Sequence, residues 1–160
     1  MAWRGGVAVT EWLSDDEQRA WRALLRTSEL LQGALDTQLQ RDAGIPHTYY
    51  VVLAMLSEAP DRTLRMSELA FAASASPSRL SHAVGRLEGR GWVRRRPSPR
   101  DGRGILATLT DAGWDFLVQQ APGHVAAVRR SLFDHLTPQQ VDQLGTALGG
   151  IVEGLERGTA

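Results

Sequence analysis

The 160-residue chain contains no cysteine and no lysine. The missing cysteines exclude disulfides, thiol-based redox sensing and Cys-ligated zinc. All 18 basic residues are arginines, whose guanidinium groups favour bidentate contacts with phosphate and guanine. No apolar run is as long as a membrane span, and the start of the chain lacks the apolar region and cleavage site of a signal peptide. We expect a cytoplasmic protein with no membrane contact.

Enzyme motifs are also missing from the sequence. It has no P-loop, no G-x-S-x-G, no H-E-x-x-H and no G-x-G-x-x-G after a predicted strand. Its four histidines supply few groups for acid–base or nucleophilic catalysis. We predict that the protein is not an enzyme and needs no cofactor.

Residues 76–110 contain a helix-start signal followed by an arginine-rich hairpin. Ser76 is a good N-cap, and Pro77 fits the first helical position because an N–H needs no partner there. The apolar residues that follow form one helical stripe: Leu80, Val84 and Leu87. The opposite face carries short polar or basic side chains, which suit base edges and phosphates: Ser78, Arg79, Ser81, His82 and Arg86.

A small hairpin is predicted after this helix. Two short strands, at 92–93 and 105–109, flank a Pro-, Gly- and Arg-rich turn at 94–104. A further helix at 68–73 and a turn at 74–76 precede the Ser76 helix. This order of elements predicts a winged helix-turn-helix.

Positive charge is concentrated on the same segment. Residues 79–103 hold eight arginines and two acidic residues, although the whole chain is formally neutral. An ordinary charge run would be a solvated face. Because this run coincides with a recognition helix and a wing, we interpret it as a DNA-binding surface.

Amphipathic helices are predicted on both sides of the hairpin. Ser14 and Glu17 form a capping box that starts a long helix reaching about residue 42. Another helix starts at Thr110, with a kink or brief break expected at Pro122, and a last helix follows a capping box at Thr137. Their apolar stripes indicate a dimerisation layer. The predicted fold is mainly α with a small antiparallel β wing, divided into an arm and dimerisation helix (1–42), a winged domain (43–110) and C-terminal dimerisation helices (111–160).

Taken together, these residues resemble the MarR (multiple antibiotic resistance regulator) family of bacterial transcription factors. The resemblance spans about residues 14–155 and rests on RLEGRGWVRR, PRDGRGILATLT with the TDAG that overlaps its end, and the closing LTPQQ. It implies a homodimer, two winged domains on a pseudo-palindromic operator, and repression that a small ligand, often an aromatic acid, relieves. Family members commonly place a wing arginine in the minor groove, at the position of Arg103, and carry a basic residue where His82 stands.

The recognition helix and the wing supply the candidate DNA contacts. The predicted set is Ser76, Ser78, Arg79, Ser81, His82, Arg86, Arg94, Arg95, Arg96, Arg100, Asp101 and Arg103. Arg79 could bond guanine or contact a phosphate, and His82 could read a base or be a neutral surface residue. Arg103 suits a narrow, A·T-rich minor groove, while Asp101 either orients a wing arginine or only forms the turn. Arg86 and the run at 94–96 are expected to meet phosphates.

A ligand pocket is predicted in the seam between the dimerisation helices and the winged domain. Its candidate lining is Trp21, Arg22, His47, Tyr50 and Trp114. The aromatic side chains would stack on an aromatic acid, and Arg22 or His47 would meet its carboxylate. Each has a plainer interpretation, because Trp21 and Trp114 lie on apolar stripes typical of a core and His47 can simply start a helix.

Two other binding functions stay open. His47, His124 and His135, with nearby carboxylates, could serve a zinc-responsive DNA-binding regulator, although their spacing matches no recognised motif. A winged helix can also bind another protein. Such a surface should be apolar, whereas this one is dense in arginine.

Overall fold

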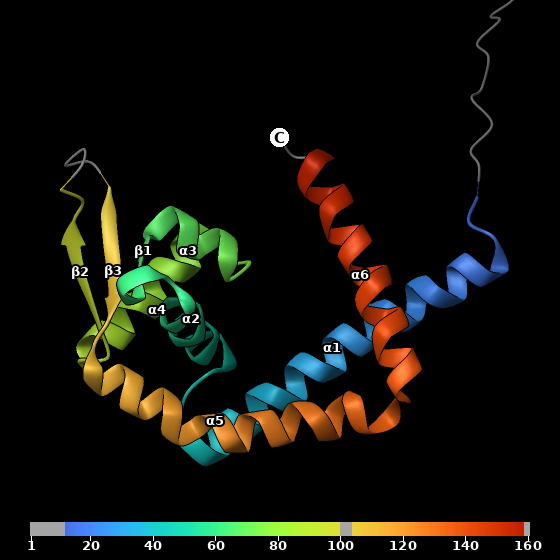
Figure 1. The fold of residues 1–160 in the computed structure, drawn as a ribbon, viewed down its shortest axis with the longest axis horizontal. Helices are drawn as coiled ribbons and strands as arrows, with labels where there is room; N and C mark the ends of the chain where they lie inside the picture. The colour runs from blue at the N-terminus through green and yellow to red at the C-terminus, as the bar shows by residue number, and fades with distance from the viewer. Residues whose placement is uncertain (1–11, 100–103, 159–160) are drawn as a thin grey trace, which may run out of the picture.

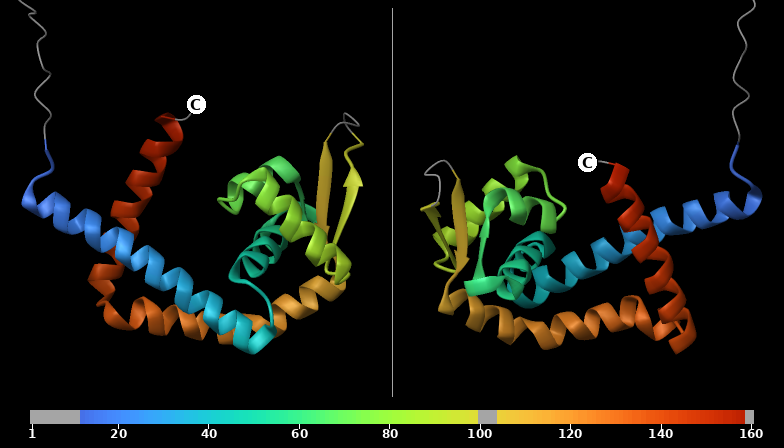
Figure 2. Two further views of the ribbon diagram at one scale, coloured as in Figure 1. Left: turned by 180° about the vertical axis from the view of Figure 1, so that it is seen from behind. Right: turned by 45° about the horizontal axis from the view of Figure 1, so that its top comes forward.

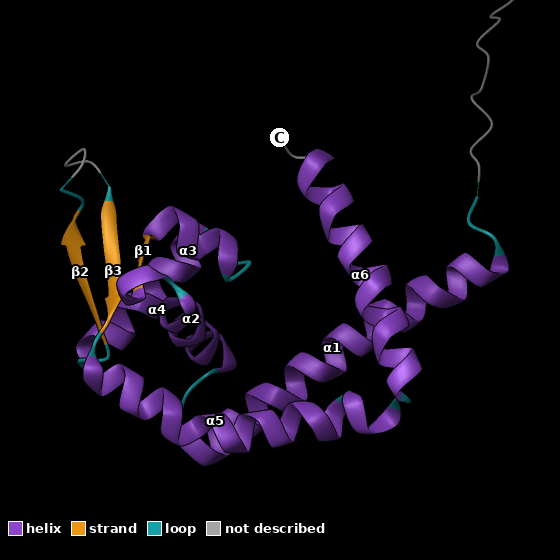
Figure 3. Cartoon of the chain, viewed as in Figure 1, coloured by secondary structure: helices purple, strands orange, loops and turns teal. Residues whose placement is uncertain are grey.

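The computed structural model describes residues 12–99 and 104–158 (Figure 1, with further views in Figure 2). Six α-helices carry most of this part of the chain: α1 (Asp15–Ala43), α2 (His47–Glu58), α3 (Met66–Ala72), α4 (Pro77–Gly89), α5 (Asp111–Ser131) and α6 (Pro138–Gly158). The other elements are the 3-10 turns η1 (Pro60–Arg62) and η2 (Phe133–His135) and the strands β1 (Thr63–Arg65), β2 (Val93–Pro97) and β3 (Ile105–Leu109). The predicted fold class is confirmed (Figure 3). None of the helices in these two ranges is long and apolar enough to cross a membrane.

The strands form one antiparallel sheet in the order β1-β3-β2. Ala107 of β3 lies opposite Arg95 on one side and opposite Leu64 of β1 on the other. Strand β2 continues to Pro97, so the expected two-residue strand at 92–93 was wrong. The reason is that the arginines continue the ladder with β3 instead of starting the turn.

The core of the winged domain lies between α2, α3, α4 and the sheet. The predicted stripe of α4 is confirmed, because Leu80, Val84 and Leu87 are completely buried. They belong to one cluster with Leu53 of α2 and Leu69 of α3. Burying a side chain of this size stabilises the fold by about 1.5–3 kcal/mol. The core therefore fixes which face of α4 points outward.

Helix α5 starts directly against the base of the wing. Thr110 caps it, because its Oγ accepts the Gly113 N–H at 3.1 Å and donates to the Gly91 carbonyl at 2.7 Å. Gly113 has no room for a side chain, since a Cβ there would lie 2.2 Å from the Trp92 carbonyl oxygen and 2.7 Å from Leu109 Cδ1. The glycine lets the first turn of α5 rest on the backbone of the wing.

The break expected at Pro122 does not occur. Helix α5 contains Pro122 in its interior and continues through it without interruption, and its ribbon is bent (Figure 1). A bend is the usual response to an interior proline, because the ring clashes with the carbonyl of the preceding turn. The expected kink is consistent with this shape.

The long helices contact the winged domain at one end and extend away from it. Helices α1 and α5 run side by side, and α6 projects away from them (Figure 2). No residue of α6 is buried in the described protomer. Large apolar side chains are exposed on all three helices: Trp21, Leu24, Leu25, Leu30, Val118, Val125, Leu148, Ile151, Val152 and Leu155. Apolar exposure of this extent marks an interaction surface.

Candidate nucleic-acid interface

The outward face of α4 is polar and basic. Ser76 caps the helix, and its Oγ accepts the Arg79 N–H at 3.4 Å. The five predicted contact residues on this face are all exposed: Ser78, Arg79, Ser81, His82 and Arg86. Because the opposite face is held by the core, these side chains are presented together on the surface of the winged domain.

The three arginines of β2 do not behave alike. Arg94 and Arg96 are exposed, whereas Arg95 between them is half-buried and forms an ion pair with Glu88 of α4. The Arg95 backbone and side chain both donate to this carboxylate, which holds the pKa of Glu88 below its usual range. Successive side chains of a strand point to opposite faces, so this pattern distinguishes Arg95 from its two neighbours once β2 is known to include all three.

Two arginines outside the predicted set, Arg65 and Arg90, also have contacts near the wing. Arg65 of β1 donates to Ser98 Oγ at 3.3 Å, close to the wing turn. The Arg90 guanidinium lies 5.0 Å from the centre of the Trp92 ring. The predicted wing residues Arg100, Asp101 and Arg103 lie outside the described residues.

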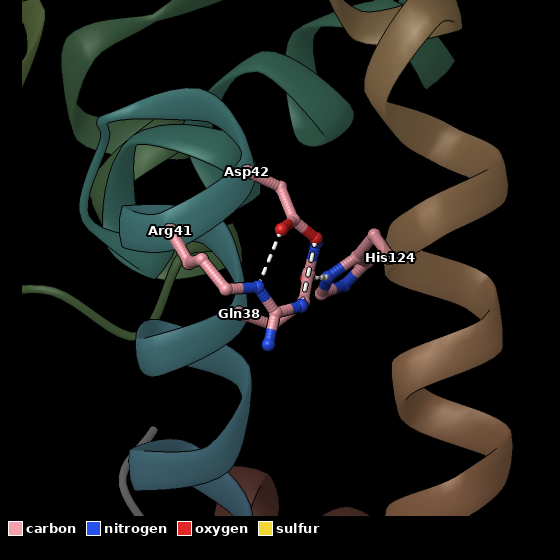
Figure 4. A network of polar contacts seen from close by, with 4 residues as sticks. All are labelled: Gln38, Arg41, Asp42 and His124. Carbon is pink, nitrogen blue, oxygen red and sulfur yellow. Dashed lines mark hydrogen bonds and ion pairs between the residues drawn. The ribbon is translucent and has the colours of Figure 1, made fainter.

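A polar cluster joins α1, α2 and α5 where the winged domain meets the long helices. Gln38 of α1 is 4% exposed, donates to Asp42 at 3.0 Å and lies with its Oε1 3.3 Å from His124 Nδ1 (Figure 4). The His124 ring centre is 4.2 Å from that of Tyr50 and 5.4 Å from that of His47. Two of the five predicted ligand residues, His47 and Tyr50, therefore lie in this cluster, together with His124, which was not among them.

The environment of this cluster favours neutral histidines. Burial lowers the pKa of His47, with the nearby Asp36 acting in the opposite direction. Burial also lowers the pKa of His124, and the neighbouring His47 adds to the effect. Asp42 stays ionised, because hydrogen bonds from Arg41 and Gln38 lower its pKa to about 2.

The remaining predicted ligand residues lie elsewhere. Trp21 is 52% exposed and, with Arg22, belongs to the N-terminal half of α1. Trp114 lies in the first turn of α5, where the Arg62 guanidinium is 4.2 Å from its ring centre. These two segments are at opposite ends of the α1–α5 pair (Figure 1). The structure does not bring these three side chains together with His47.

A cavity of about 300 Å³ opens beside α2 and the helix-turn-helix turn. His47 and Thr48 line it from α2, Ser74 from the turn and Arg79 from α4. Ser74 has a φ of 47°, in the left-handed region that a serine rarely adopts. Arg79, a candidate DNA contact, and His47, a candidate ligand contact, therefore line the same cavity.

The residues proposed for zinc do not form a metal site in the described part of the chain. His47 and His124 are neighbours, but His135 belongs to η2, beyond the end of α5. Among residues 12–99 and 104–158, no group of three or more His, Cys, Asp or Glu side chains could hold a metal ion. The zinc-responsive alternative has no site among these residues.

The fold and the exposed basic face define a winged helix-turn-helix protein, and comparisons with known proteins agree. The MarR family model matches residues 43–104. Sco3205, a MarR family transcriptional regulator from Streptomyces coelicolor solved in complex with DNA, is 52% identical, covers 93% of both chains and superposes with a TM-score of 0.86. The transcriptional repressor Rv2887 of Mycobacterium tuberculosis is 33% identical over 80% of this chain and 89% of its own.

The chain belongs to the MarR family of transcriptional regulators, as the sequence resemblance predicted. This is a non-enzymatic family, which confirms the expectation that the protein is not an enzyme. The transcriptional repressor MprA of Escherichia coli is a more distant relative, 29% identical over 73% of this chain. The chain spans 65% of the length of MprA.

Proposed function

We propose that the protein is a sequence-specific DNA-binding repressor that acts as a homodimer on a pseudo-palindromic operator. The observation that carries this proposal is the exposed face of α4, whose polar and basic side chains all point away from the core. An α-helix fits the major groove, where each base pair shows its own pattern of donors and acceptors. The DNA complex of Sco3205 and the repressor function of the curated relatives support the same reading.

Each structural part takes a definite role in this proposal. Arg79 reads a base or holds a phosphate from the N-terminal half of α4, and Arg86 meets a phosphate further along. Arg94 and Arg96 supply charge to the backbone from the exposed face of β2. Arg103 enters the minor groove, in line with the family resemblance.

The homodimer is supported by the exposed apolar stripes of α1, α5 and α6. A helix of 21 residues with none of them buried has too little contact with its own chain to explain its apolar face. A second copy would cover these stripes. It would also set two α4 helices on half-sites about one helical turn apart, roughly 34–36 Å.

The test is a selection of bound fragments from genomic DNA, followed by fluorescence-anisotropy titrations on the enriched sequence. Arg79→Ala should weaken binding and relax the preference at one base pair, since a bidentate base contact contributes about 1–3 kcal/mol of discrimination. Arg103→Ala should weaken binding as well. Arg19→Ala, which removes the same charge from the exposed surface of α1, is the matched control. No enrichment of any sequence, or equal affinities for all variants, would contradict the proposal.

We further propose that a small aromatic acid binds in the cavity between His47 and Arg79 and releases the operator. The cavity volume of about 300 Å³ is at the lower end of ligand sites. The Arg79 guanidinium would bind the carboxylate with charge-assisted hydrogen bonds. The same guanidinium is needed for DNA, so ligand and operator would compete for one side chain, and by linkage each weakens the other.

A panel of phenolic and aromatic acids tests this proposal through thermal stabilisation and release of labelled DNA. His47→Ala should abolish the response to the active acid while DNA binding persists. His135→Ala, a change at an exposed histidine in η2, is the control. If no acid stabilises the protein and none releases DNA, the effector proposal is wrong, whereas DNA binding itself is unaffected.

A further inference from the structure

Glu88 holds the wing to the end of the recognition helix through three contacts with one residue. Its Oε1 accepts the Arg95 backbone N–H at 2.9 Å, and its Oε2 accepts from Arg95 Nε at 2.8 Å and lies 2.7 Å from Nη2. Both side chains are about one-third exposed. Because one of the three bonds goes to the main chain, the carboxylate fixes the strand β2 itself and not only a side chain.

The Arg95 side chain lies on the helix side of the wing. A Cβ placed on Gly85, one turn earlier in α4, would be 3.9 Å from Arg95 Nη2. The guanidinium therefore extends along α4, on the face of β2 opposite to Arg94 and Arg96. Its charge is already neutralised by Glu88.

Strand β2 is an edge strand, hydrogen-bonded to β3 on one side. A two-stranded hairpin is marginally stable without support from other elements. A protein that reads the major groove with α4 and the adjacent minor groove with its wing needs the two at a fixed separation. If the protein already holds α4 and the wing at this separation before it meets DNA, binding loses less conformational entropy.

We propose that Glu88 and Arg95 form a clamp that positions the wing relative to α4, and that Arg95, unlike Arg94 and Arg96, contacts no phosphate. This inference rests on the proposed DNA-binding function. It divides the arginine run of β2 into two side chains that face DNA and one that faces the protein. Glu88 and Arg95 are positioning residues, which act on DNA only through the wing.

The salt dependence of binding separates these roles. Each phosphate contact adds about 0.9 to the slope of log K against log salt concentration. Arg94→Ala and Arg96→Ala should each lower the slope by about that amount. Arg95→Ala should leave the slope unchanged and weaken binding by roughly two- to tenfold at every salt concentration, because it removes a charged contact that is about one-third exposed.

Glu88→Gln gives a second test, because simple electrostatics and the clamp predict opposite changes in DNA affinity. Removing a negative charge beside DNA should strengthen binding if the charge acts directly on the phosphates. The clamp predicts weaker binding, and reduced discrimination at the flanking base pairs under the wing while the base preference of α4 is kept. The double variant Glu88→Gln/Arg95→Ala should bind no more weakly than Arg95→Ala alone, because the two residues act as one unit.

A circular dichroism melt of each variant shows whether it is folded at the assay temperature. If Arg95→Ala is unfolded there, the result for Glu88→Gln decides the test. The clamp is overturned if Arg95→Ala lowers the salt slope as Arg94→Ala does, or if Glu88→Gln tightens binding. These results leave the proposed function intact. If the unmodified protein binds no DNA fragment, the proposed function fails, and the clamp fails with it.

Discussion

Gly113 is the position where a single methyl group should do the most damage. In the structure its Cα faces the Trp92 carbonyl, and a Cβ would lie 2.2 Å from that oxygen, 2.7 Å from Leu109 Cδ1 and 3.0 Å from the Trp92 carbonyl carbon. Two of these three atoms belong to the backbone and cannot rotate away. Gly113→Ala must therefore push the first turn of α5 off the wing.

The expected cost follows from three terms. Overpacking in a tight site costs about 1–3 kcal/mol, and the upper end applies because the obstacle is main chain. The Trp92 carbonyl also accepts the Thr110 N–H at 3.0 Å, and loss of this bond adds about 1 kcal/mol. Alanine is better than glycine in a helix by about 1 kcal/mol, which offsets part of the damage. The net loss in unfolding free energy is about 3 kcal/mol, or roughly 6–12 °C in Tm for a chain of this size.

Urea unfolding followed by circular dichroism, at one fixed protein concentration, measures this loss. Gly89→Ala is the matched control in α4, because a Cβ there meets nothing within 4 Å. The control should be as stable as the unmodified protein or slightly more so. A Gly113→Ala protein within about 0.5 kcal/mol of the unmodified one would refute the packing argument, since that is the range of ordinary surface changes.

Three further predictions concern the caps, the histidines and the long helices. Thr110→Ala removes the cap of α5 and its bond to Gly91 and should cost about 1–2 kcal/mol in urea unfolding, while Thr110→Ser should stay close to the unmodified protein. Because the pKa values of His47 and His124 are lowered in the folded state, the unfolded chain binds protons first as pH falls below the ordinary value of 6.5. Unfolding free energy should therefore decrease from pH 7 to pH 5, and His124→Gln should flatten this decrease; an unchanged pH profile would exclude His124 as a contributor. Ile151→Asp on the exposed apolar stripe of α6 should give a monomer in sedimentation velocity, whereas Glu153→Gln should sediment as the unmodified protein does.

Features that depend on local spacing could be predicted from the sequence. Leu80, Val84 and Leu87 recur with the helical period, so the buried face of α4 and its exposed face followed directly. The capping box at Ser14 involves residues three apart and is present as expected. Such patterns need no knowledge of the rest of the fold.

Features that depend on contacts between distant segments could not be predicted from the sequence. The length of β2 depends on its ladder with β3, and an arginine run beside glycine and proline resembles a turn when taken alone. The pairing of Arg95 with Glu88 then depends on which face of β2 meets α4. The His47–His124 contact depends on where α5 crosses α1 and α2, and no spacing within either helix encodes that register.

The seating of α5 on the wing has a mechanical consequence. Because no side chain lies between Gly113 and the Trp92 carbonyl, the first turn of α5 rests directly on the backbone of the wing. The helix then continues without a break to Ser131, near the point where α6 departs. A tilt of α5 would therefore reach the base of the hairpin through a backbone contact that no side chain cushions.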